Sequence, residues 1–148
     1  DNGVEYVSLE TLLRRSSIIS LHCPLTPKTY HLINDETLAI TQKGVMIINT
    51  GRGGLIDTQS VIRSLKKGHI GYLGLDVYEQ ECGIFFEDLS EKGIEDDTIA
   101  RLVTFPNVIV TSHQGFFTHE AMCEIARVTC QNIVGSYNGV VDPAFQLC

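Results

Sequence analysis

Short apolar runs rich in β-branched residues alternate with helical segments along nearly the whole chain, and this alternation constrains the fold most strongly. The runs are apolar throughout instead of alternately apolar and polar, which is typical of strands buried on both faces of a parallel sheet. Parallel strands cannot be joined by a tight hairpin, so a crossover helix has to connect each pair. The sequence therefore predicts an α/β protein: a parallel sheet with helices on both faces.

Capping residues and periodicity set the expected bounds of the elements. Ser8, Asn34 and Asp57 are expected N-caps, and Gly68 is the expected left-handed residue after the helix that Asp57 begins. The expected helices run over Leu9–Arg15, from Asn34 to about Gln42, over Thr58–Lys67 and from about Thr118 to Tyr137. The expected strands are Val4–Val7, Ile18–His22, Val45–Asn49, Tyr72–Val77 and Val108–Thr111. The stretch Glu79–Asp97 is long, irregular and acidic, and a loop of that length in so compact a pattern usually serves a site.

Size, charge and hydropathy exclude several classes of protein. At 148 residues the chain is long enough to bury a core of its own as one domain. Its net charge of −7 argues against nucleic acid or an anionic membrane as a partner. No apolar run approaches the roughly 20 residues that a membrane helix needs, and we expect no signal peptide. The five cysteines are odd in number and show no CxxC, which favours free thiols in a reducing cytoplasm over disulfides or a metal site.

Polar side chains follow the expected strands at the points where the strands end. Arg52, Glu81 and His113 each lie within a few residues of the end of a different expected strand. Parallel strands end at the same edge of a sheet, and ligands bind in such sheets at the carboxyl ends of the strands. We therefore expect an arginine, carboxylates and a histidine to converge on one edge.

Arg52 lies in the glycine-rich turn NTGRGGLID (49–57), which resembles a phosphate-binding loop. A phosphate cradle would need the spacing GxxxxGK[ST] or GxGxxG, and Ile56 stands where the second motif needs its third glycine. Two interpretations of Arg52 remain open: an exposed turn arginine, or a guanidinium that grips a carboxylate through two hydrogen bonds.

His113 lies in the turn SHQGFF (112–117) instead of on an apolar helix face. A lone histidine in such a turn is as often a structural hydrogen-bonding group as a functional one. A neighbouring carboxylate would favour the imidazolium, raise the pKa of the ring and prepare it to donate a proton near neutral pH. Glu81 is the better candidate for that carboxylate and Glu79 the competitor, unless both belong to a solvated acidic loop. The remaining histidines are interpreted as structural, and their spacing predicts no metal site: His22, His31, His69 and His119.

Three segments carry a resemblance to a known family: HCPLTPKTYHLIN (22–34), GVMIINTGRGGLIDTQSVIRSLKKGHIGYLGLDVYEQE (44–81) and PNVIVTSHQGFFT (106–118). They resemble the D-isomer-specific 2-hydroxyacid dehydrogenases, and the FFED at 85–88 is typical of the D-lactate dehydrogenase branch. The resemblance covers nearly the whole chain, and the motifs occur in the family's order and spacing. It implies a partial Rossmann-type sheet and an NAD-linked reaction. In that reaction, hydride passes between the nicotinamide and C2 of a 2-keto acid such as pyruvate.

The resemblance also implies roles for residues at matching positions. Arg52 would hold the substrate carboxylate and polarise the keto group, and His113 would donate the proton to the carbonyl oxygen. Glu81 would hydrogen-bond His113 and tune its pKa. Phe116 matches an aromatic residue beside the substrate side chain, where a small apolar niche would suit pyruvate. The positions that match cofactor contacts are Cys23, Pro24, Thr29, Thr50, Gly51, Arg52 and Asp76.

The sequence departs from the family pattern in two ways. Gly51 and Gly115 stand where relatives more often carry Ser or Ala, and both loosen the backbone beside a catalytic residue. The family's GxGxxG turn, its ribose-binding Asp and its substrate domain do not occur in the 148 residues. We therefore expect residues 1–148 to be the C-terminal part of an NAD-binding domain that is inactive alone. The sheet edge and helix faces that the first half would cover should then be exposed.

The parent enzyme is expected to interconvert pyruvate and D-lactate with NAD(H) in the cytoplasm, as a homo-oligomer with no nucleic-acid or membrane partner. Another 2-keto acid is the alternative substrate, because the pocket wall that would choose it belongs to the absent substrate domain. A non-catalytic truncated product or a dinucleotide-sensing interaction module is an alternative of a different class, although the intact set of Arg52, Glu81 and His113 favours descent from a working enzyme. A flavodoxin-like domain that binds flavin is the weakest alternative.

Overall fold

The computed structural model describes residues 3–82, 84–85 and 95–140, and the chain divides into two compact units. The first unit extends to His113 and holds the sheet. The second unit begins at Gln114 and holds α5 (His119–Tyr137), which starts at the N-cap Thr118 as predicted. Much of the acidic stretch expected between Glu79 and Asp97 lies outside the described residues.

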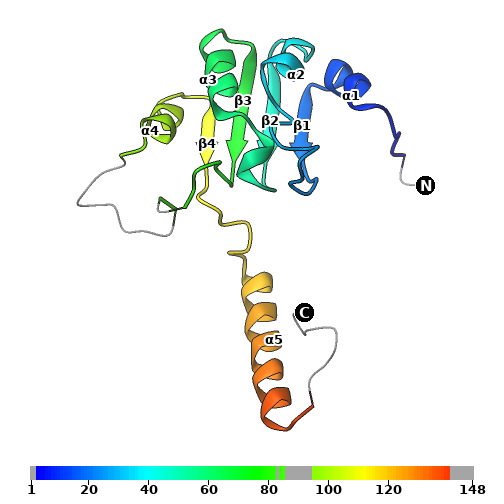
Figure 1. The fold of residues 1–148 in the computed structure, drawn as a ribbon, viewed down its shortest axis with the longest axis vertical. Coiled ribbons are helices and arrows are strands. Elements are labelled where there is room, and N and C mark those ends of the chain that lie inside the picture. Colours follow the sequence, from blue (N-terminus) through cyan, green and yellow to red (C-terminus); the bar gives the residue numbers. More distant parts are fainter. Residues whose placement is uncertain (1–2, 83, 86–94, 141–148) are drawn as a thin grey trace. The chain divides into compact units, whose positions relative to one another are not determined.

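Four parallel strands form the sheet of the first unit, and they lie side by side in chain order (Figure 1). They are β1 (Ile18–Leu21), β2 (Val45–Asn49), β3 (Ile70–Leu75) and β4 (Val108–Val110). The predicted parallel α/β class is therefore confirmed. β3 starts two residues earlier than predicted, because Ile70 pairs with Val45 across a bulge in which Gly71 is the extra residue.

Side-chain caps and one hydroxyl set the ends of the helices in this unit. The helices are α1 (Leu9–Arg15), α2 (Asp35–Ala39), α3 (Thr58–Lys66) and α4 (Asp97–Val103). Each of the three predicted N-caps accepts a backbone N–H of the first turn, and Gly68 follows α3 with a φ of 65°. α2 is shorter than predicted, because the backbone N–H and the hydroxyl of Thr41 both donate to the Leu38 carbonyl and tighten the chain into a turn.

The four helices form one layer on one face of the sheet, since each contacts the next in chain order. This arrangement follows from the strand order, because right-handed crossovers that always step to the next strand place every helix on the same face. The sheet face beneath the helices is buried, with Ile47 and Leu73 only 0% and 2% exposed. Helices were predicted on both faces of the sheet. In the described part of the first unit they cover only this face. On the other face Ile18, Tyr72 and Ile109 are 59%, 60% and 67% exposed.

The strand predicted at Val4–Val7 is wrong. The segment pairs with no strand of the described sheet, and the side chains of Val4 and Tyr6 are exposed. β-branched residues favour extended backbone, but a strand forms only where a neighbouring edge supplies hydrogen-bond partners.

The described residues carry free thiols and no candidate membrane span or metal cluster. No helix in that part of the chain is both long and apolar enough to cross a membrane. The described cysteines carry free thiols, and Cys148 lies outside the described residues. No three of the described His, Cys, Asp and Glu side chains are grouped so that they could hold a metal ion.

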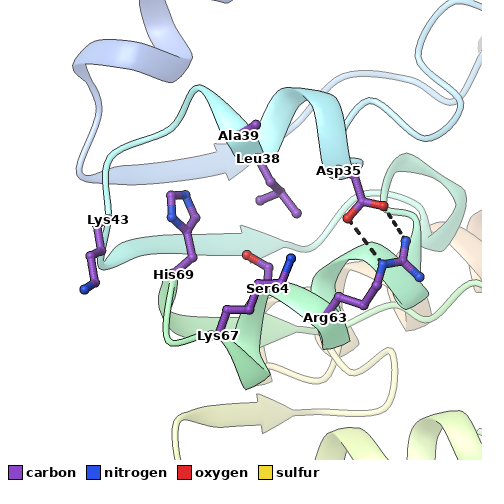
Figure 2. A pocket seen from close by; sticks show the side chains of 8 residues that line it. All are labelled: Asp35, Leu38, Ala39, Lys43, Arg63, Ser64, Lys67 and His69. Carbon is purple, nitrogen blue, oxygen red and sulfur yellow. Dashed lines mark hydrogen bonds and ion pairs between the residues drawn. The ribbon is translucent and has the colours of Figure 1, made fainter.

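A groove of about 570 Å³ lies between α2 and α3 (Figure 2). It is lined by Asp35, Leu38, Ala39, Lys43, Arg63, Ser64, Lys67 and His69. The Arg63 guanidinium donates to the Asp35 carboxylate at 2.5 Å, and this bond holds the pKa of Asp35 below its usual range. Lys43 and His69 shortly precede β2 and β3, so the groove reaches the amino ends of these strands. None of the residues with a predicted site role lines it.

Replacing Ile47 by Ala should lower the free energy of unfolding by about 2–4 kcal/mol, because the side chain is fully buried and leaves a cavity. The matched control Ile109→Ala removes the same atoms from the open face and should cost less than about 1 kcal/mol. Urea denaturation of the chain measures both values. Equal losses would mean that the open face is packed in solution.

Candidate active site

The turn after β2 carries Arg52 and is held by the side chain of Asn49, the last residue of that strand. Asn49 is fully buried; its Oδ1 accepts the Gly51 N–H at 3.1 Å, and its Nδ2 donates to the Arg52 carbonyl oxygen at 2.9 Å. The Arg52 side chain is exposed, and its Nη1 donates to the Gly51 carbonyl oxygen at 2.9 Å. The turn thus presents a guanidinium at the surface, and the partly buried hydrogen bonds of the Asn49 amide hold the backbone of the turn in place.

Gly53 packs this turn against the backbone that leads to Glu81. A Cβ at Gly53 would lie 2.2 Å from both the carbonyl carbon and the carbonyl oxygen of Tyr78, so no side chain is accommodated there. Gly51 is different, because a Cβ there would meet its nearest neighbours at 3.4 Å, which is ordinary contact. The fold therefore has room at Gly51 for the Ser or Ala that the family pattern more often carries.

His113 pairs with Glu81 just after β4. The His113 Nδ1 lies 3.1 Å from Glu81 Oε1, and the second carboxylate oxygen accepts the Tyr78 backbone N–H at 3.1 Å. The two side chains are 34% and 28% exposed, so both are partly shielded yet reachable from solvent. Ser112 and His113 have φ values of 53° and 57°, a left-handed pair that turns the chain sharply after the strand. The geometry thus brings together His113 and the better of its two predicted carboxylate partners.

Glu79, the competing carboxylate, is engaged elsewhere. Its Oε1 lies 2.6 Å from His31 Nε2, and its Oε2 accepts the Thr58 hydroxyl at 3.0 Å at the start of α3. Tyr30 stacks on the His31 ring with 3.9 Å between ring centroids. These contacts tie the loop after β1 to α3 and to the loop after β3, which is a structural role for His31 as predicted.

Asp76 links the turn of Arg52 to His113 through the backbone. Its N–H donates to the Asn49 carbonyl at 2.9 Å, and its own carbonyl accepts the His113 N–H at 2.5 Å. The Asp76 carboxylate accepts the Thr111 hydroxyl at 2.5 Å and is nearly buried, with the residue 8% exposed. Hydrogen bonding between neighbouring strands therefore continues past the strand ends and aligns the residues at the carboxyl edge.

Tyr78 anchors the loop that carries Glu81. The buried Tyr78 hydroxyl donates to one carboxylate oxygen of Asp96 at 2.9 Å, while the other caps α4. Burial and this hydrogen bond to a carboxylate raise the pKa of Tyr78 well above its usual value. The loop after β3 is therefore fastened to α4.

The other positions with predicted cofactor roles lie after β1 and β2 at the same edge. Cys23 is partly buried, and Pro24 and Thr50 are exposed. The Thr29 hydroxyl donates to the Pro24 carbonyl at 2.7 Å and accepts the Thr26 N–H at 2.8 Å, so it shapes its own loop. That Thr29 also contacts the cofactor remains a prediction.

Phe116 belongs to the second unit, where it is 47% exposed and lies edge-to-face with Phe117, with ring centroids 6.2 Å apart. Its predicted place beside a substrate stays a prediction, as does any effect of Gly115, which lies in the same unit.

A parallel α/β sheet with polar residues gathered at its carboxyl edge is the architecture of a nucleotide-binding domain. The chain belongs to the D-isomer specific 2-hydroxyacid dehydrogenase family: residues 1–115 match the NAD binding domain of that family. The chain is therefore related to an NAD-binding domain of oxidoreductases.

Relatives agree with this assignment over nearly the whole chain. D-lactate dehydrogenase of Escherichia coli is 50% identical over 95% of this chain and 43% of its own length. A 2-hydroxyacid dehydrogenase homolog of Schizosaccharomyces pombe is 47% identical over 95% of this chain and 42% of its own length. Among solved structures, the pyruvate reductase of Chlamydomonas reinhardtii superposes with a TM-score of 0.88 at 44% identity, covering 93% of this chain and 43% of that one. The chain thus spans less than half the length of these relatives.

Several residues that build the site were missed by sequence reasoning. The sequence places Asn49 at the carboxyl end of an expected strand without assigning it a role, although a buried-strand asparagine directly before a glycine-rich turn can signal a turn-holding amide. The contact of Gly53 with Tyr78 joins two segments that are distant in the chain, so no pattern of neighbouring residues predicts it. The link from Asp96 to Tyr78 is of the same kind.

Gly53→Ala should lower the free energy of unfolding by more than about 2 kcal/mol, because its Cβ would overlap the Tyr78 carbonyl and force the two loops apart. The matched control Gly51→Ala should change stability by less than about 1 kcal/mol, since its Cβ finds ordinary contacts. Thermal and urea unfolding of the two variants provide the comparison. A tolerated Gly53→Ala would show that the loops are not in contact.

Proposed function

We propose that residues 1–148 form the C-terminal part of the NAD-binding domain of an enzyme that interconverts pyruvate and D-lactate. The observation that carries this proposal is the His113–Glu81 pair at the sheet edge to which the turn of Arg52 is also fastened. The match to D-lactate dehydrogenases supports the substrate class. The complete enzyme would also supply the GxGxxG turn and the substrate domain, which do not occur in these residues.

Arg52 binds the substrate in this proposal. Its guanidinium is exposed and presents a planar fork of N–H donors, which matches the two oxygens of a 2-keto acid carboxylate. The same positive charge polarises the neighbouring keto group. Release of the bond from Nη1 to the Gly51 carbonyl would free that nitrogen for the substrate.

His113 supplies the proton. Reduction of the keto group needs a hydride at C2, which NADH provides, and a proton at the carbonyl oxygen, which the protonated imidazole donates. Glu81 bonds Nδ1, so Nε2 is the ring atom that faces the substrate, and the carboxylate complements the charge of the imidazolium. In the reverse direction the neutral ring accepts the hydroxyl proton of D-lactate.

The cofactor side of the site fits the nicotinamide end of NAD. The carboxamide of nicotinamide offers N–H donors, and the Asp76 carboxylate at the sheet edge is an acceptor suited to them. Thr50 and Gly51 would line the ring beside Arg52, while Cys23, Pro24 and Thr29 would line it from the loop after β1. The reaction is therefore assigned to one edge of one sheet.

His113→Gln in the complete enzyme should lower kcat for pyruvate reduction roughly a hundredfold or more, because the proton donor is lost. The matched control His69→Gln, at the other end of the sheet, should keep nearly the full rate. NADH oxidation with pyruvate is followed by absorbance for both variants. An undiminished rate in His113→Gln would remove His113 from the mechanism.

The isolated 148-residue chain should show no NADH oxidation with pyruvate, because the helix-terminal anchor for the cofactor pyrophosphate is absent from it. The same assay with the complete enzyme is the positive control. Activity of the isolated chain that disappears in Arg52→Ala would contradict this expectation.

Two alternatives remain distinguishable from this proposal. One relative, an aromatic 2-oxoacid reductase of Clostridium sporogenes, is 44% identical, so a larger 2-keto acid is the competing substrate. Comparing kcat/KM for pyruvate and phenylpyruvate in the complete enzyme decides between them. A dinucleotide-sensing interaction module is the non-catalytic alternative, against which the intact set of Arg52, Glu81 and His113 argues. It would bind NADH without turning over any 2-keto acid.

A further inference from the structure

Arg52 lies in a turn with little rigidity of its own. Glycines precede it and follow it, at positions 51, 53 and 54, and glycine backbone has the widest range of accessible conformations. A guanidinium can grip a carboxylate through two bonds only if its backbone holds the fork at the required angle. Something outside the turn therefore has to restrict the backbone around Arg52.

Asn49 provides that restriction from the buried end of β2. Its amide bridges the turn, since the oxygen accepts the N–H before Arg52 and the nitrogen donates to the carbonyl of Arg52 itself. The residue is 0% exposed, and its backbone carbonyl accepts the N–H of Asp76, the residue that directly follows β3. The sheet thus holds the Asn49 backbone in place, and the two hydrogen bonds of the Asn49 side-chain amide restrict the backbone of the turn.

We infer that Asn49 is a positioning residue that sets the presentation of Arg52 to the substrate carboxylate. This inference rests on the proposed function of Arg52. Asn is suited to the task because a short amide offers a donor and an acceptor at once. Asp offers only acceptors and would set a carboxylate oxygen against the Arg52 carbonyl, while Ala offers neither group.

The role predicts a specific kinetic signature. Binding of the 2-keto acid depends on the angle of the Arg52 fork, whereas the His113–Glu81 pair is held by separate contacts with the Tyr78 and Asp76 backbones. Loss of the Asn49 amide should therefore weaken substrate binding and slow turnover without changing the pH profile of kcat. Affinity for NADH should change less, because the cofactor positions Cys23, Pro24 and Thr29 after β1 and the Asp76 carboxylate do not depend on the Asn49 amide.

The test compares Asn49→Ala with Thr41→Ala in the complete enzyme. Thr41 is a matched control, because it is also buried and its hydroxyl also makes two hydrogen bonds, to the Leu38 carbonyl and to His69, far from Arg52. Both variants should lose thermal stability. Only Asn49→Ala should raise KM for pyruvate about tenfold or more and lower kcat, with the dissociation constant of NADH changed less than about threefold.

Two further measurements keep the inference open to refutation if Asn49→Ala folds poorly. Asn49→Asp keeps the size of the side chain and an acceptor for the Gly51 N–H, so it leaves no cavity, and it should still raise KM, since the donor to the Arg52 carbonyl is lost. Hydrogen exchange of the Gly51 amide should be slow in the wild type and in Thr41→Ala, and fast in Asn49→Ala.

The possible outcomes distinguish a failure of the positioning role of Asn49 from a failure of the proposed function. An active wild type in which both Asn49 variants keep the KM of Thr41→Ala would overturn the positioning role alone. A rise of KM together with a shifted pH profile would show general damage to the site and would also overturn it. A complete wild-type enzyme that reduces no 2-keto acid would overturn the proposed function, and the positioning role with it.

Discussion

The parallel alignment of four strands is the constraint on which the site depends. Because all four strands run the same way in chain order, their carboxyl ends meet at one edge and bring together residues that are far apart in the sequence. The pairing does not stop at the strand ends. Asp76 donates to Asn49 and accepts from His113, so the candidate catalytic residues continue the hydrogen bonding of the sheet. Their backbone positions are therefore set by the same interactions that hold the strands together.

The loops beyond that edge are fastened to one another by contacts that leave little room for substitution. Gly53 lies directly against the Tyr78 carbonyl, and the N–H of Tyr78 orients the Glu81 carboxylate. The hydroxyl of Tyr78 reaches Asp96 at the start of α4. One buried tyrosine thus connects the turn of Arg52, the partner of His113 and a helix. Pre-organisation of this kind is what proton transfer and carboxylate binding require, since both depend on angle and distance.

The one-sided helical layer explains why the chain looks like part of a larger architecture. Each crossover steps to the adjacent strand in the same direction, so right-handed connections leave the opposite sheet face without cover from the first unit. That face exposes large apolar side chains such as Tyr72 and Ile109. The relatives are more than twice as long as the matched region, and the NAD-binding family assignment holds for the part that is present. The proposed activity is therefore a proposal for an enzyme of the relatives' full length.

The α/β class, the N-caps and the left-handed Gly68 could be predicted from the sequence, because they depend on residues close together in the chain. The sequence also singled out Arg52, Glu81 and His113, since strand ends can be located from local patterns. It could not show that Val4–Val7 has no strand partner, that α4 forms behind Asp96, or that the helices lie in one layer. The three-dimensional arrangement was needed to show that Glu81 bonds His113 while Glu79 bonds His31, and that Asn49 holds the turn of Arg52. Such pairings join distant segments, and their geometry follows from strand register and packing, which no local pattern encodes.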